Sequence, residues 1–422
     1  MPTAERVVFG LTLQPRAATE SHSDRRFGPR LGPPPAVDAV TNSSNVLSAP
    51  RTRRHGLVLL AVGCCACLLS TSCSRNGVGG GNDPIALGVG AVPGRPGYDN
   101  VVRGVELAVE RLNERGKVKF RVRLPDAGAS SAVRVAQGLR DDPSVIGVVG
   151  HPESGHSIEA LPVYSDGEHA GANAVVMVSP TASSPRLSGI SPWFFRVAPS
   201  DNDAAKFVAR WTLDSLGGRR AALIYRNDSY GRDWSSTFST AFREGGGQVV
   251  SRDPYLTGIT EWEAYALLLK KLKPDVLLFP GDAGDAVELL RALQLADVKV
   301  AFVGGDGTEA MAEAPEANGA RFVAFFRPER ATSAEGQSFV NRYKARFKTD
   351  PDMFAALSYD AALAIGTTVI AGARTRQAVR DAIERIGTGT PSLDGAGGRI
   401  AFRGNHDAAG RTVVVTRIEN DQ

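Results

Sequence analysis

Apolar and polar stretches alternate in a regular order from Pro84 to the end of the chain. The run from Ile85 to Val92 is almost entirely apolar, which is typical of a strand buried on both faces. Behind it, apolar residues recur at the helical spacing i, i+3, i+4 and i+7, at Val105, Ala108, Val109 and Leu112. The repeated strand–helix order predicts an α/β fold with mostly parallel sheets flanked by helices.

The alternation falls into two sets, which predicts two lobes. In the first set, further strands are expected at 118–124, at Val145 to Val149 and at Ala174 to Val178. The second set predicts strands at 221–225, 248–251, 276–279, 300–304 and 322–325. The tail adds a helix at 377–386 and two final strands.

Two segments are expected to carry the chain from one lobe to the other. The first lies near Arg196 to Asp201, where Ser200 and Asp201 are placed to cap a helix. The second is Arg327-Pro328-Glu329, where proline ends a strand. Lobe 1 would then comprise residues 84–197 and 328–375, and lobe 2 residues 198–327 and 376–422.

Two short loops rich in hydroxyl groups follow neighbouring strands of the first lobe. One runs from Glu153 to Ser157 and the other from Ser179 to Ser184. Backbone N–H groups and helix N-termini converge at the carboxyl ends of parallel strands, and they attract anions there. The two loops therefore predict a site for a carboxylate. Each hydroxyl residue could instead be a simple helix cap, which is a common use of Ser and Thr.

The charge of the chain is concentrated at its amino-terminal end. The net charge is +4, and the first 72 residues, with eight Arg and four acidic residues, account for all of it. The remaining residues carry 41 basic and 41 acidic side chains. A neutral body lacks the basic surface that binds nucleic acid, so we expect no nucleic-acid partner.

All four cysteines lie within ten residues, at positions 64, 65, 67 and 73, which excludes a disulfide framework in the body. Arginines at 51, 53 and 54 precede an apolar core, and small residues lead to Cys73. Residues 51–72 resemble a bacterial lipoprotein signal peptide, although Ser70 stands where that motif prefers Leu. The resemblance implies that Cys73 is lipidated and anchors the chain to a membrane. Residues 73–83, rich in Gly and Asn, suit a flexible tether.

Residues 1–50 are rich in Pro, Ser and Arg and show no sustained apolar period. Signal peptides do not normally begin fifty residues before their basic region. We therefore expect this leader to be disordered, or to lie upstream of a true translation start near Val46.

Several short motifs of the body occur in the order found in one protein family. They are Gly150-His151 with Ser154-Gly155, Val178-Ser179-Pro180, Phe194-Phe195-Arg196, Asp228-Ser229-Tyr230-Gly231, Gly304-Gly305-Asp306-Gly307 and Tyr359-Asp360-Ala361. With them the chain resembles a type I periplasmic binding protein of the leucine/isoleucine/valine-binding family of ABC-transporter substrate-binding proteins. The resemblance spans roughly residues 84–415.

The resemblance implies an extracytoplasmic protein that binds an amino acid between its lobes and delivers it to an ABC permease, with no cofactor. Ser154, Thr181 and Ser183, together with backbone N–H groups such as that of Ala182, would bind the ligand carboxylate. Asp306 would bind the ligand ammonium from the other lobe. Tyr98 and Tyr230 are candidates for the wall of the cleft.

Other ligands and roles stay open. The loop 280–285 lacks an aromatic residue that amino-acid binders often carry there, and the insert 166–173 is long for the family. Asp282 could recognise a second cationic group, or it could be a loop acid or helix cap. The alternatives are a ligand-sensing lipoprotein of the same fold and a binder of an amide, a polyamine or a small carboxylate.

Catalysis and metal binding are not expected. His151 and His156 lie five residues apart, which does not place both on one helix face, and no third ligand is evident. The segment Gly88 to Gly94 approaches a dinucleotide-binding motif but has Pro in place of the third Gly. Pro152 holds the glycine position that a nucleophile elbow around Ser154 would need, and no base is paired with that serine.

Overall fold

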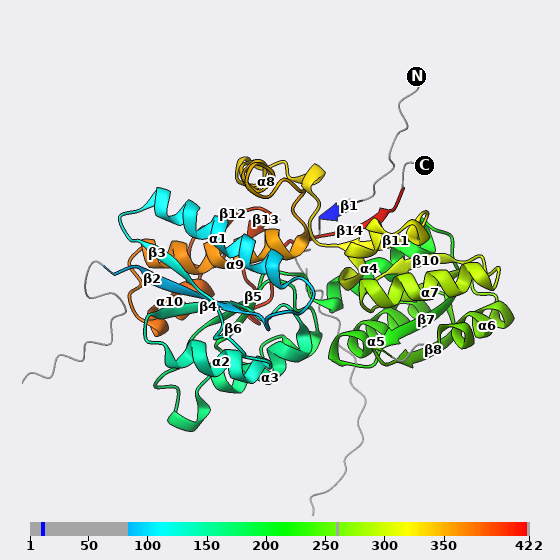
Figure 1. The fold of residues 1–422 in the computed structure, drawn as a ribbon, viewed down its shortest axis with the longest axis horizontal. Helices are drawn as coiled ribbons and strands as arrows, with labels where there is room; N and C mark the ends of the chain where they lie inside the picture. Colours follow the sequence, from blue (N-terminus) through cyan, green and yellow to red (C-terminus); the bar gives the residue numbers. More distant parts are fainter. Residues whose placement is uncertain (1–9, 13–82, 259–260, 420–422) are drawn as a thin grey trace, which may run out of the picture. The chain divides into compact units, whose positions relative to one another are not determined.

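The computed structural model describes residues 10–12, 83–258 and 261–419. Its strands form a five-stranded sheet, a seven-stranded sheet and a two-stranded hairpin, flanked by helices (Figure 1). The α/β fold expected from the alternation is therefore confirmed. Cys73, the signal segment 51–72, most of the tether and most of the leader lie outside the described residues.

The five-stranded sheet is parallel throughout. Its strands, in spatial order, are β3 (Phe120–Arg123), β2 (Ile85–Gly90), β4 (Val145–Gly150), β5 (Met177–Ser179) and β6 (Phe194–Arg196). Every residue of β2 and β4 is buried because helices cover both faces of the sheet. One face packs on α1 (Tyr98–Arg115), α9 (Met353–Ile370) and α10 (Arg376–Glu384), and the other on α2 (Ala132–Asp141) and α3 (Ser154–Tyr164).

The seven-stranded sheet belongs to the second lobe. Its strands, in spatial order, are β1 (Gly10–Thr12), β14 (Thr412–Arg417), β11 (Arg321–Ala324), β10 (Ala301–Gly304), β9 (Val276–Phe279), β7 (Arg220–Arg226) and β8 (Gln248–Tyr255). The pairs β1–β14 and β14–β11 are antiparallel, and the other neighbouring strands of this sheet are parallel. One face packs on α4 (Asp201–Asp214) and α5 (Ser229–Glu244), and the other on α6 (Trp262–Leu272) and α7 (Ala283–Leu295).

Both sheets place their first strand between their second and third. The order β3-β2-β4-β5-β6 is repeated in the second lobe as β8-β7-β9-β10-β11. The loops after β2 and β4, and those after β7 and β9, therefore diverge to opposite faces and leave a crevice at the carboxyl edge of each sheet. Both hydroxyl loops lie at this edge of the first sheet.

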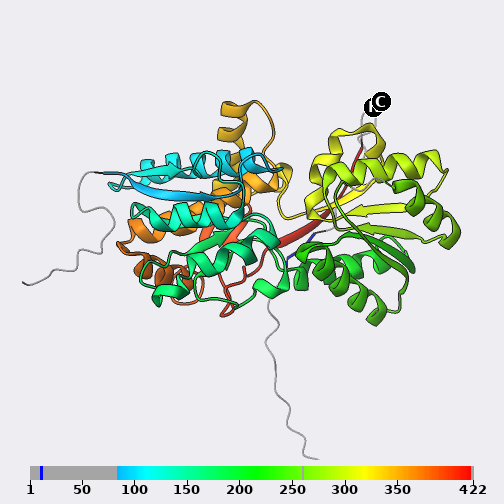
Figure 2. The same cartoon turned by 60° about the horizontal axis from the view of Figure 1, so that its bottom comes forward.

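The last part of the chain corrects one expected boundary. The second lobe was expected to resume at residue 376, but α10 packs on α9 and β4. Its apolar residues Val379 and Ile383 are buried there, and Arg376 Nε donates to the Val145 carbonyl at 2.8 Å. The hairpin of β12 (Leu393–Gly395) and β13 (Gly398–Ile400) contacts α9 and α8 (Ala334–Phe347). After β11, the chain returns to the seven-stranded sheet only with β14 (Figure 2).

Helix α9 is the most apolar helix of the first lobe. It is long and apolar enough to cross a membrane, yet 83% of that stretch is buried inside the protein. It packs along α1 and under β4 and β5, so within the described residues it is a core helix.

Helices α1 and α9 approach each other closely at Gly104. A Cβ added there would lie 2.2 Å from the Ala355 carbonyl oxygen, which is backbone and cannot move aside. We predict that Gly104→Ala lowers the free energy of unfolding by about 1–3 kcal/mol, because it forces the two helices apart. Urea denaturation measures this. The control Gly284→Ala on α7, where a Cβ meets no atom within 4 Å, should leave stability equal or higher; equal losses would contradict the proposed contact.

Candidate functional site

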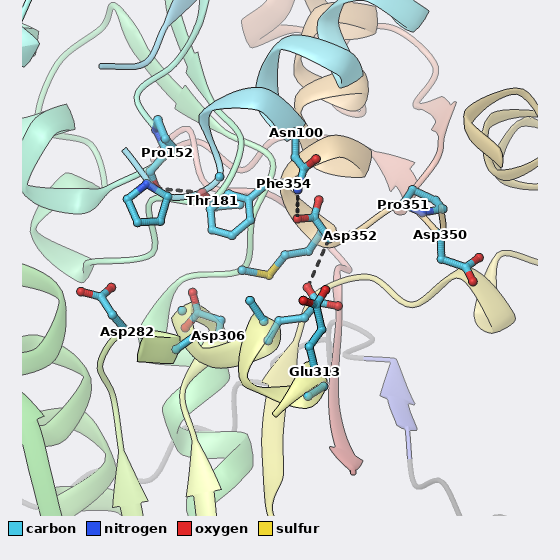
Figure 3. A pocket seen from close by; sticks show the side chains of 18 of the residues that line it. Asn100, Pro152, Thr181, Asp282, Asp306, Glu313, Asp350, Pro351, Asp352 and Phe354 are labelled. Carbon is cyan, nitrogen blue, oxygen red and sulfur yellow. Dashed lines mark hydrogen bonds between the residues drawn. The ribbon is translucent and has the colours of Figure 1, made fainter. Parts of the chain in front are cut away.

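A cavity of about 840 Å³ lies where the loops at the carboxyl ends of the two sheets face one another (Figure 3). The first lobe contributes Asn100, Pro152, Ser154, Thr181 and Ser183, among others. The second contributes Arg226, Tyr230, Asp282, Asp306 and Glu309. The cavity thus brings together five of the seven ligand-binding residues expected from the sequence.

The hydroxyl loops brace each other across the end of the first sheet. Ser154, the first residue of α3, accepts a hydrogen bond at Oγ from the Ser184 backbone N–H at 3.1 Å. Thr181 Oγ1 donates to the Pro152 carbonyl at 2.8 Å, so its proton is not available to an anion. Within the described residues, the buried Ser183 Oγ forms no hydrogen bond of ordinary geometry, although it lies near enough to the Asp201 carboxyl to lower its pKa. Ser154 and Ser183 can therefore still donate their O–H groups to a ligand.

Two of the expected site residues do not line the cavity. The Ala182 N–H already donates to Ser179 Oγ at 3.1 Å, and its methyl group packs in the core beneath α2 and α3. Tyr98 begins α1 and lines a smaller hollow that shares Gly97, Asn100 and Arg103 with the cavity. The Ala182 N–H is thus already bonded within the loop, and a ligand contact of Tyr98 stays a prediction.

The second lobe contributes a buried acid to the cavity. Asp306 follows β10 and opens the 3₁₀ helix η3 (Asp306–Glu313). Its Oδ1 accepts a hydrogen bond from the Tyr230 hydroxyl at 2.8 Å, and only 5% of the residue is exposed. Burial raises the pKa of the Asp306 carboxyl to about 6. A cation that replaces the lost water would favour the ionised form.

The sequence did not point to Arg226, which lines the cavity at the end of β7. Its guanidinium pairs with Asp228 at 2.6 Å and with Asp282 at 2.5 Å. Asp282 therefore already has a cationic partner, which favours the loop-acid interpretation over recognition of a second ligand charge. The sequence feature that could have indicated it is an arginine directly after the expected strand 221–225, with an acid, Asp228, two residues later.

A second acidic region lies farther along the cavity. Glu309 of η3 accepts a hydrogen bond from the Met353 N–H at 3.3 Å and pairs with Arg327 at 3.1 Å. Asp352 caps α9 and accepts from Asn100 Nδ2 at 2.7 Å (Figure 3). Burial and then the nearby charge of Asp352 raise the pKa of Glu309 to about 7. In total, eight acidic and five basic side chains line the cavity, so its balance favours a ligand that carries positive charge.

The sequence profile of the periplasmic binding protein family matches residues 93–422. This chain belongs to that family. The resemblance drawn from the sequence motifs is thereby confirmed at the level of the family.

Among curated relatives, this chain is similar to the Leu/Ile/Val-binding protein BraC3 of Rhizobium johnstonii, with 28% identity over 219 residues. That match covers 50% of this chain and 57% of the relative, so the chain spans little more than half the length of the curated relatives it matches.

Solved structures support the fold over most of the chain. The leucine-binding protein LivK of Thermotoga maritima shares it with a TM-score of 0.71 at 23% identity, over 80% of this chain and 96% of that one. An ABC transporter substrate-binding protein of Desulfitobacterium hafniense in complex with leucine gives a TM-score of 0.68 at 26% identity, over 80% of this chain and 98% of that one.

The hydroxyl groups of Ser154 and Ser183 differ in how much they contribute to the stability of the fold. We predict that Ser154→Ala lowers the free energy of unfolding by about 1–3 kcal/mol, because the buried Ser184 N–H loses its acceptor. Ser183→Ala is the matched control, since its hydroxyl has no partner in the described chain, and it should leave stability nearly unchanged. Thermal and urea denaturation of the ligand-free variants give both values. A larger loss for Ser183→Ala would show that the hydroxyl roles are reversed.

Proposed function

We propose that this periplasmic binding protein captures an amino acid, branched-chain or related, and delivers it to an ABC permease as an extracytoplasmic lipoprotein anchored at Cys73. The observation that carries the proposal is the pairing, in one cavity, of an unpartnered hydroxyl at Ser183 with a buried carboxyl at Asp306. The first end suits a carboxylate and the second an ammonium group.

The recognition follows from hydrogen bonding and charge. The carboxylate accepts from Ser154, at the N-terminus of α3 where the helix dipole also favours an anion, and from Ser183 in the loop after β5. The ammonium lies at Asp306, with the Tyr230 hydroxyl holding that carboxylate in position. Because the two groups come from different lobes, a zwitterion that contacts both favours the closed arrangement of the lobes.

The side-chain end of the ligand would meet apolar residues. Pro152, Met353 and Phe354 line the cavity, and Figure 3 shows Phe354 and Pro152 in the part that also holds Thr181. This wall, and the leucine bound in the Desulfitobacterium structure, support an apolar side chain. No step of the proposal requires a reaction, so we propose a binding protein and not an enzyme.

A second candidate ligand class is a basic amino acid or a polyamine. The excess of acidic over basic side chains lining the cavity favours it. A thermal-shift screen of the chain from residue 76 onward separates the classes, since a ligand that binds only the folded state raises the melting temperature. Leucine, isoleucine and valine should raise it; a rise with arginine or spermidine alone would favour the cationic class, and a rise with benzoate alone would contradict the role of Asp306.

The ammonium contact predicts a specific loss of affinity. We expect Asp306→Asn to weaken L-leucine binding by about 2 kcal/mol or more, roughly thirtyfold, because the buried ammonium loses its counter-charge. Isothermal titration calorimetry at pH 7.5 measures this. Asp350→Asn serves as control, because Asp350 lines the same cavity but is exposed and paired with Lys344 at 2.6 Å. Unchanged affinity in Asp306→Asn would remove Asp306 from the site.

A further inference from the structure

Asp201 is buried directly behind the hydroxyl loop. It is the first residue of α4, and its own N–H donates to the Ser183 carbonyl at 2.8 Å. The residue is fully buried, and neither carboxylate oxygen has a hydrogen-bond partner in the described part of the chain. An ionised carboxylate in such a place would be costly, whereas a protonated one is tolerated.

On balance, the surroundings of Asp201 do not stabilise its ionised form. Asp306 of η3 and Asp233 of α5 are negative neighbours that raise the pKa of its carboxyl, whereas the Ser183 side chain and the charge of Arg196 lower it. Its cationic neighbour, Arg196 of β6, is already paired with Asp407 at 2.6 Å. Burial, and then the charge of Asp306, raise the pKa of the Asp201 carboxyl well above its usual range.

The surroundings of Asp306 are similar. Tyr230 of α5 donates to it, and Arg226 of β7 is its cationic neighbour. That guanidinium is itself bound by Asp228 and Asp282. Two buried carboxyls thus interact with each other, and each has only a cation that is already paired elsewhere.

We infer that Asp201 is a positioning residue of the ammonium end of the cavity, and that with Asp306 it holds one shared proton in the empty protein and releases it when an ammonium group binds. The inference rests on the proposed function for its ligand. The ammonium stays protonated as it enters; the proton leaves the carboxyl pair for the solvent, and no covalent bond other than that O–H changes.

Proton release makes ligand affinity depend on pH. At a pH below the pKa of the pair, the pair must lose a proton for each ammonium bound, so affinity falls about tenfold for each unit of pH decrease. Above that pKa the pair has already lost the proton, and affinity changes little with pH. The empty protein follows the opposite trend: its stability falls as pH rises from the pKa of an unfolded aspartate, about 4, to the raised pKa of the pair, because over that range the folded protein keeps a proton that the unfolded chain has lost.

The empty protein tests the shared proton without any ligand. Asp201→Asn should melt with the wild type at pH 4.5 and roughly 2–5 °C above it at pH 8, because the amide needs no proton to remain buried. Asp214→Asn, an exposed position at the end of the same helix, is the control and should show no such difference. Equal melting temperatures of Asp201→Asn and wild type at pH 8 would overturn the inference.

A titration of the wild-type protein covers the case in which Asp201→Asn does not fold. Carboxyl carbon NMR of ligand-free protein should show a buried aspartate that titrates above pH 5. If every aspartate titrates below pH 4.5, the inference is wrong.

Calorimetry with L-leucine then tests the link to binding. At pH 5.5, in buffers of different ionisation enthalpy, the wild type should release up to one proton per ligand, and Asp201→Asn less than half as much. Binding with no proton release would overturn the inference while leaving the proposed function standing. Failure of leucine to bind would count against the proposed function, and the stability and NMR results would still decide on the shared proton.

Discussion

The buried guanidinium of Arg196 is the interaction on which the hydroxyl end of the site depends. It lies at the end of β6, is fully buried, and donates to the carbonyl of Ser184 at 2.8 Å and that of Ala182 at 3.3 Å. Its charge is balanced by Asp407, 211 residues away in the sequence. One side chain therefore fixes the loop that carries Ser183 and ties it to the segment that leads into β14. Removing either partner would leave an uncompensated buried charge, which is far more costly than losing an exposed ion pair.

The two ends of the cavity are prepared in different ways. At the hydroxyl end, most polar groups of the loops already bond to each other, so the loops keep their shape and offer few free donors. At the acidic end, the carboxyls of Asp201 and Asp306 lack full compensation. A rigid donor end and an acidic end that needs a cation together suit a zwitterion better than an anion or a neutral solute.

Much of the architecture could be predicted because periodicity reports burial directly. The apolar run at Ile85 and the helical stripe at Val105 predicted the parallel sheet and its covering helix, and both occur. The rule that parallel strands end at one edge placed Ser154 and Ser183 at the carboxyl edge of the first sheet, and the family resemblance added Asp306; all three line one cavity. The boundary at residue 376 was missed because the stripe of α10 shows that one face is buried, but not which lobe buries it.

The sequence by itself determined the two-lobed α/β fold, the position of the hydroxyl loops and the presence of an acid after β10. Tertiary structure alone decided which polar groups remain free. The Thr181 hydroxyl donates to the Pro152 carbonyl, and the Ala182 N–H donates to Ser179 Oγ. The Asp282 carboxylate is paired with Arg226. The physical reason is that a hydrogen bond or ion pair depends on partners brought within about 3 Å by folding, whereas the apolar pattern along the chain records only which face of each element is buried.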